Sequence, residues 1–76
     1  MKKQEVIELL LSRGWQALGE PLPAEGGGAY QQYVLKKQSV WVGNCFIENE
    51  RSPFALDYKR AESDDLLRFL DGDFYV

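Results

Sequence analysis

The apolar periodicity of this chain changes twice, and that change limits what it can fold into. Residues 4–13 and 63–71 carry apolar side chains at three- and four-residue spacing, which predicts an amphipathic helix near each end. Residues 30–59 are instead rich in aromatic and β-branched side chains, which favour strands. This order predicts a two-layer α+β domain, in which an antiparallel sheet packs against helices.

Both predicted helices end at a glycine. Glycine readily adopts the left-handed conformation that closes a helix, so Gly14 and Gly72 predict the two helix ends. Trp15 follows Gly14 and is placed to fold back on Leu10, which indicates a core residue rather than a binding residue. At the start of the second helix, the hydroxyl of Ser63 predicts the N-cap.

The predicted order is α-β-β-β-α, with three strands at residues 30–35, 40–48 and 54–59. Their short polar connections predict an antiparallel meander. Residues 19–29 are rich in glycine and proline, which predicts a flexible loop, and no Gly-Lys-Ser/Thr follows the triple glycine as a phosphate loop requires. The closing residues 74–76 are apolar enough to dock as a short strand or a packed tail.

The 76 residues predict a single domain, and a domain of this size buries about 60% of its unfolded surface. The single cysteine, Cys45, cannot close an intrachain disulfide, which suits a reducing compartment. We therefore expect a cytoplasmic protein. No apolar stretch is long enough for a transmembrane helix, so no contact with a membrane is expected.

The sequence contains no histidine, and this absence excludes most catalytic sites. Neither a Ser-His-Asp relay nor a Cys-His pair can form, and one cysteine cannot build a zinc cluster. Asp71 and Asp73 have the spacing that opens a calcium loop, but the later glycine and glutamate ligands are missing. The helix dipole explains Asp64 and Asp65. We expect no enzymatic activity, no catalytic residue, no metal and no cofactor.

Charge is unevenly distributed along the chain. Residues 1–43 hold five basic and four acidic side chains, whereas residues 44–76 hold four basic and eight acidic ones, so the net charge of -3 arises in the second half. An acidic surface suits a basic partner, such as a nucleic-acid-binding protein, although acidic runs are also typical of a solvated face. The basic side chains that duplex RNA would need are few and offset by acids: Lys2, Lys3, Lys36, Lys37, Lys59 and Arg60.

The expected strand at residues 40–48 is apolar on both faces. Its alternation predicts Val40, Val42 and Phe46 on one face, and Trp41, Cys45 and Ile47 on the other. A sheet covered by helices on one side keeps only that side dry, so the surplus apolar surface predicts a protein-binding patch or a homodimer interface through the sheet. The alternative interpretation is that the helices and the C-terminal residues cover both faces.

The predicted protein contact has an aromatic centre and an acidic rim. It consists of Trp41 with Tyr30 or Tyr33, flanked by Glu48 and Glu50 at the strand end. The second candidate for the partner-facing surface is the acidic C-terminal segment, with Asp64, Asp65, Asp71 and Asp73. Both candidates predict a protein partner rather than nucleic acid.

The opening segment 6–15, VIELLLSRGW, and the α-β-β-β-α order resemble HicA-type mRNA interferase toxins, which use the double-stranded-RNA-binding fold. The catalytic histidine of that family has no counterpart here, so this resemblance implies a nucleic-acid-binding adaptor without nuclease activity. In size and acidity the chain also resembles antagonists made by phages and other mobile elements, such as anti-CRISPR proteins, which block a nucleic-acid-binding surface. The leading hypothesis is therefore a non-enzymatic, protein-binding inhibitor, and the adaptor is the alternative.

Overall fold

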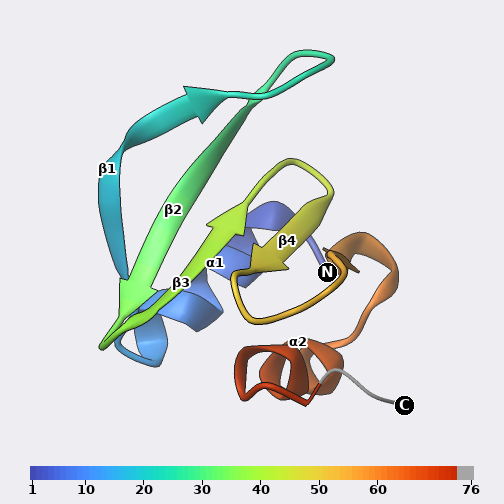
Figure 1. The fold of residues 1–76 in the computed structure, drawn as a ribbon. Coiled ribbons are helices and arrows are strands. Elements are labelled where there is room, and N and C mark those ends of the chain that lie inside the picture. Colours follow the sequence, from blue (N-terminus) through green and yellow to red (C-terminus); the bar gives the residue numbers. More distant parts are fainter. Residues whose placement is uncertain (74–76) are drawn as a thin grey trace.

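The computed structural model describes residues 1–73 and shows two α-helices and one five-stranded sheet (Figure 1). The elements are α1 (Lys3–Ser12), β1 (Gln16–Pro23), β2 (Ala29–Leu35), β3 (Gln38–Val42), β4 (Phe46–Asn49), β5 (Leu56–Asp57), the 3₁₀ helix η1 (Tyr58–Arg60) and α2 (Ser63–Leu70). The strands pair antiparallel in chain order, as a meander does. The predicted α+β class is confirmed, with five strands in place of three. The expected apolar tail at 74–76 lies outside the described residues.

Both helices end at the glycines that the sequence predicts. At the end of α1, the Trp15 amide donates to the Leu10 carbonyl at 3.0 Å, and Gly14 has a φ of 93°. At the end of α2, the Asp73 amide donates to the Arg68 carbonyl at 2.9 Å, and Gly72 has a φ of 92°. Both arrangements are Schellman motifs, which satisfy carbonyl groups that a helix end leaves open.

The predicted N-cap of α2 is wrong by one residue. Glu62 caps the helix, and Ser63 is its first helical residue. A capping box forms in which the Glu62 amide donates to the Asp65 carboxylate at 2.9 Å. The Asp65 carboxylate accepts one hydrogen bond from the Glu62 amide and another from the Arg68 guanidinium at 2.6 Å. A serine hydroxyl at position 63 does not provide these two contacts.

The expected flexible loop at residues 19–29 is a second point of correction, because residues 19–23 belong to strand β1 and only residues 24–28 form a turn. This strand pairs with β2 from Gln16↔Val34 to Pro23↔Ala29, and a bulge between Leu18 and Leu22 takes up the extra residues. Prolines are tolerated there because β1 is an edge strand, whose outer amides have no ladder partner. Hairpin pairing thus overrides the loop-like composition, which a local interpretation of the sequence cannot detect.

The single strand expected at residues 40–48 is two strands, β3 and β4, joined by a tight turn at residues 43–45. Val42 therefore lies opposite Ile47, and Trp41 lies opposite Glu48. The turn restarts the alternation, so Ile47 shares the inward face with Val42, and Phe46 points outward with Trp41. The predicted division of these side chains between the faces is wrong for this reason.

The third expected strand, at residues 54–59, is reduced to Leu56–Asp57 and continues as the 3₁₀ helix η1. The Asp57 carboxylate accepts from the Lys59 amide at 3.2 Å and caps this short helix. The turn carries Tyr58 into the core, where it is fully buried.

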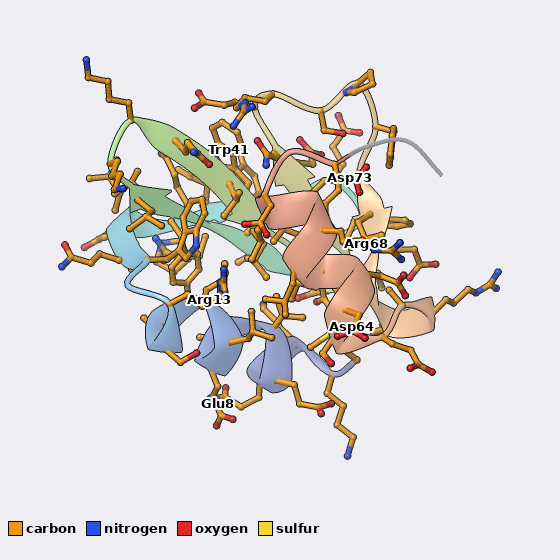
Figure 2. The ribbon with its side chains drawn as sticks, turned by 90° about the horizontal axis from the view of Figure 1, so that it is seen from below. Glu8, Arg13, Trp41, Asp64, Arg68 and Asp73 are labelled. Carbon is orange, nitrogen blue, oxygen red and sulfur yellow. The ribbon has the colours of Figure 1, made fainter. Side chains whose placement is uncertain are left out.

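The hydrophobic core lies between one face of the sheet and the two helices. Both helices contribute residues to this core, and in the view of Figure 2 α1 runs below the strands while α2 lies in front of them. The core residues are Val6, Leu10, Trp15, Tyr33, Val40, Val42, Ile47, Tyr58, Leu66, Phe69 and Leu70. The buried Asn49 also joins the two layers, because its amide donates to the Phe69 carbonyl at 3.2 Å.

The opposite face of the sheet is not covered by a helix in the described part of the chain. Leu18 and Phe46 on this face are each 51% exposed, and Leu22 is 46% exposed. The interpretation in which both faces are covered therefore does not hold for residues 1–73. Neither helix there is long and apolar enough to cross a membrane.

Candidate functional site

A groove of about 720 Å³ opens on the uncovered face of the sheet. Three aromatic side chains line it, each from a different strand: Tyr30 from β2, Trp41 from β3 and Phe46 from β4. We call this site the aromatic groove and define it by these three residues together with Gly43 at its floor. It contains the two residues, Trp41 and Tyr30, that the sequence indicates as the aromatic centre of a contact.

The strand register explains why the three rings surround an open space. Trp41 lies opposite Gln32 on one side and Glu48 on the other, and Tyr30 and Phe46 lie two residues beyond these partners on the same face. Gly43 extends the register of β3, since its amide donates to the Phe46 carbonyl at 2.9 Å. It therefore lies between Tyr30 and Phe46, and because it has no side chain it leaves the floor open.

The core residue Tyr58 holds Gly43, at the floor of the groove, through a hydrogen bond. The Tyr58 hydroxyl donates to the Gly43 carbonyl at 2.6 Å. Burial, with a smaller contribution from the Cys45 thiol, raises the pKa of Tyr58 to about 12. This tyrosine keeps its proton, and with it the hydrogen bond, throughout the neutral range. The sequence did not indicate this role, because Tyr58 was expected in a strand.

The turn between β1 and β2 forms one wall of the groove through Ala24, Glu25 and Gly27. Gly28, at the end of this turn, has a φ of 80° and lies so close to Asn44 that an added Cβ would overlap the Asn44 amide. The sequence predicted a flexible linker for the triple glycine. The glycines instead let the turn approach Asn44 and close the groove on that side.

The charge of the groove is acidic. Its lining contains the carboxylates of Glu25 and Glu48 and no lysine or arginine. Lys3, at the start of α1, lies near the groove, and its Nζ donates a hydrogen bond to the Asn44 Oδ1 at 3.0 Å. Cys45 is half-buried and lines the groove.

Tyr33 was predicted as an alternative to Tyr30 in the aromatic centre, and this prediction is wrong. It lies opposite Val40, faces the helices and is only 6% exposed, and burial raises its pKa. Glu50 lies away from the groove at the other end of β3, where its carboxylate accepts from the Ser39 amide at 3.0 Å. Of the predicted acidic rim, only Glu48 lines the groove.

The acidic C-terminal candidates do not join the groove. Asp64 and Asp73 lie at opposite ends of α2, on the helix-covered side of the sheet (Figure 2). Asp71 pairs with Arg13 at 3.7 Å. The amide of Glu62 and then the Arg68 guanidinium lower the pKa of Asp65, so this carboxylate serves the helix start. These four acids form no common surface with Trp41.

The aromatic residue that sequence reasoning missed in the groove is Phe46, and Glu25 and Gly43 were missed as well. The outward direction of Phe46 depends on the turn at residues 43–45, for which Gly43-Asn44 was the available signal. Among residues 1–73, no three acidic or cysteine side chains come together as a metal-binding group. The groove therefore offers aromatic faces, two carboxylates and a thiol.

In comparisons with known proteins, no family model matched the chain, and neither curated proteins nor solved structures gave a match.

Proposed function

We propose that the protein is a non-enzymatic module that binds a partner protein through the aromatic groove. The observation that carries this proposal is the outward direction of Trp41, which is half-buried beside Tyr30 and Phe46 on a face that no helix covers in residues 1–73. Tryptophan and tyrosine supply much of the binding energy of protein interfaces, where they fill central pockets. A surface of this kind on so small a domain favours recognition over catalysis.

Two exposed leucines extend the same surface. Leu22 lies opposite Tyr30 on β1, and Leu18 lies opposite Gln32, so both share the face of Trp41. Contiguous apolar area of this kind is typical of interaction sites on soluble domains. A second copy of the chain could also cover it, and a homodimer through the sheet remains the competing arrangement.

The charge supports a basic partner and an inhibitory role. The net charge is -3, and the groove contributes Glu25 and Glu48. A module that occupies a basic surface prevents nucleic acid from using it, because both ligands are anionic. The likeness in size and acidity to phage antagonists such as anti-CRISPR proteins agrees with this role and adds no specific partner.

Affinity capture from the source cells, followed by quantitative mass spectrometry, tests the proposal. Wild-type protein and Leu11→Ser should retain the same protein, since Leu11 is 53% exposed on α1, away from the groove. Trp41→Ala and Phe46→Ser should each lose it. Retention of the partner by both groove variants, with their folds intact by circular dichroism, would refute the proposal. Self-association lost in the same two variants would instead identify a homodimer.

The nucleic-acid adaptor predicts a different result. Its basic candidates are Lys2 and Lys3 at the start of α1, Lys36 and Lys37 in the turn between β2 and β3, and Lys59 and Arg60 in η1. Arg60 also lies 3.7 Å from Asp57. We therefore expect weak, salt-sensitive binding to duplex RNA in a gel-shift titration. Tight binding that is lost on Lys36→Glu combined with Lys37→Glu would favour the adaptor.

A further inference from the structure

We infer that the aromatic groove receives an arginine side chain from a basic protein partner, with the guanidinium group against the ring of Trp41 and paired with Glu48. This inference rests on the proposed function and specifies the chemistry of the partner. It follows from three properties of the groove: the arrangement of its rings, the sign of its charge and the open floor at Gly43.

The rings provide the faces that a cation requires. Tyr30, Trp41 and Phe46 come from three neighbouring strands and line one groove, so a side chain that enters over Gly43 meets aromatic surface on several sides. A cation over an aromatic face is attracted by the electron-rich ring, and tryptophan binds cations best. The planar guanidinium can also stack on such a ring, which an ammonium group cannot do.

The carboxylates set the sign of the ligand. Glu48 lies directly opposite Trp41 in the register of β3 and β4, so its carboxylate lies beside the ring that would receive the cation. Glu25 adds a second negative charge from the turn between β1 and β2. No lysine or arginine lines the groove to neutralise them. An apolar ligand would cover these carboxylates without a partner, which is unfavourable, whereas an arginine satisfies them.

The dimensions of the groove agree with an arginine and its neighbours in a peptide segment. Its volume of about 720 Å³ falls within the range of sites that enclose ligands larger than a single side chain. The three methylene groups of arginine can pass between Tyr30 and Phe46 above Gly43, which has no side chain of its own to occupy this space. The acidic balance of the chain as a whole favours approach of a basic segment.

Nuclear magnetic resonance with ¹⁵N-labelled protein tests the inference directly. The probe is an acetylated and amidated Gly-Arg-Gly peptide, and the matched probe carries citrulline, which has nearly the same shape as arginine but no charge. The indole N–H of Trp41 should shift with the arginine peptide, and the buried Trp15 indole provides the internal reference. We expect the citrulline peptide to bind about tenfold more weakly, as loss of a cation–π contact and an ion pair predicts.

Protein variants test each component of the site. Glu48→Gln should weaken the arginine peptide about threefold to fivefold and leave the citrulline peptide unchanged. Glu8→Gln removes the same charge from the helix side, where Figure 2 shows Glu8 on α1, and should leave both affinities unchanged. Gly43→Val should weaken both peptides by filling the floor. A Cβ at Gly43 meets only the Phe46 carbonyl, at 3.4 Å, so the groove rather than the backbone is changed.

The outcomes separate this inference from the proposed function. Equal binding of both peptides at Trp41, or an arginine peptide that shifts other residues and not Trp41, would overturn the arginine site while partner capture through Trp41 still stood. Failure of both Trp41→Ala and Phe46→Ser to release the partner would instead overturn the proposed function. If Gly43→Val does not fold, the comparison of Glu48→Gln with Glu8→Gln decides the matter, because neither change affects the core.

Discussion

At the scale of single residues, Tyr58 links the folding core to the candidate site. Its ring is fully buried, and its hydroxyl donates to the Gly43 carbonyl at 2.6 Å. Loss of this donor is destabilising, because an intramolecular hydrogen bond of this kind contributes about 1 kcal/mol to stability. One hydroxyl therefore contributes both to stability and to the position of the groove floor.

Tyr58→Phe should lower the free energy of unfolding at pH 7 by about 0.5–1.5 kcal/mol, since it removes the hydrogen bond to the part-buried Gly43 carbonyl. The variant should also alter the pH dependence. Because the pKa of Tyr58 is raised to about 12 in the folded state from 10.0, the wild-type contribution is complete below pH 10. This stability is lost between pH 10 and 12, where the unfolded chain releases this proton first, and a shift of two pKa units corresponds to about 2.7 kcal/mol.

Urea unfolding of both proteins at pH 9 and pH 11 measures this difference. Wild type should lose more stability than Tyr58→Phe between the two pH values. Burial raises the pKa of Tyr33 as well, so part of the alkaline loss should remain in the variant. Parallel pH dependence of the two proteins would show that the Tyr58 hydroxyl is not held in the core.

Two glycines of the turn between β1 and β2 form a matched pair. Gly28 and Gly26 both have left-handed φ values, 80° and 78°, but only at Gly28 would a Cβ overlap the Asn44 side chain. Gly26→Ala should therefore cost about 1 kcal/mol from backbone strain alone, and Gly28→Ala should cost slightly more, because the exposed Asn44 side chain must also move aside. Thermal unfolding measures both. Equal losses would mean that Asn44 does not hold this turn.

At the scale of elements, α2 depends on a few polar contacts at its start. Asp65 accepts from the Glu62 amide at 2.9 Å and pairs with Arg68 at 2.6 Å. The apolar side of α2 packs Leu66, Phe69 and Leu70 into the core. The helix thus has an exposed polar start and a buried apolar face, and the two can be perturbed separately.

Asp65→Asn should lower the melting temperature at pH 7, whereas Asp64→Asn, in the same first turn, should have a smaller effect, since its side chain makes no hydrogen bond within residues 1–73. The pKa of Asp65 is lowered in the folded state, first by the Glu62 amide and then by Arg68. Its contribution is therefore present above the unfolded pKa and is lost as the pH falls through the lower, folded value. Melting curves from pH 7 to pH 2 should converge for wild type and Asp65→Asn.

The elements that the sequence predicts best are those decided by local contacts. Gly14 and Gly72 end their helices as expected, because a Schellman motif involves only six consecutive residues. The strands were harder, since an apolar run does not reveal where the chain turns back on itself. The segment of β1 forms a strand because it pairs with β2, although it contains glycine and proline, which disfavour strands. Of the site, Trp41, Tyr30 and Glu48 were predicted, but the place of Phe46 depended on the turn at residues 43–45.

At the scale of the whole molecule, the two faces of the sheet lie in different surroundings. The inward face supplies Val40, Val42 and Ile47 to a core completed by both helices. The outward face carries Trp41 with the groove and two exposed leucines. Binding and stability should therefore respond to different substitutions, even where the residues are neighbours on one strand.

Ile47→Ala should lower the free energy of unfolding by about 2–5 kcal/mol, because Ile47 is fully buried and the change leaves a cavity. Trp41→Ala should cost about 1 kcal/mol, because its side chain faces away from the core. Urea unfolding followed by circular dichroism measures both. A larger loss for Trp41→Ala than for Ile47→Ala, or a Trp41 that acrylamide does not quench, would place this side chain in the core.

The glycine at the floor of the groove has a consequence for engineering. Gly43 lacks a left-handed φ, and an added Cβ would meet only the Phe46 carbonyl at an ordinary distance, so the backbone there accepts other residues. A library that varies this position together with the outward residues Tyr30 and Glu48 would reshape the cleft while the inward face stays constant. Selection from such a library could redirect a domain of 76 residues, with no disulfide to form, toward new targets.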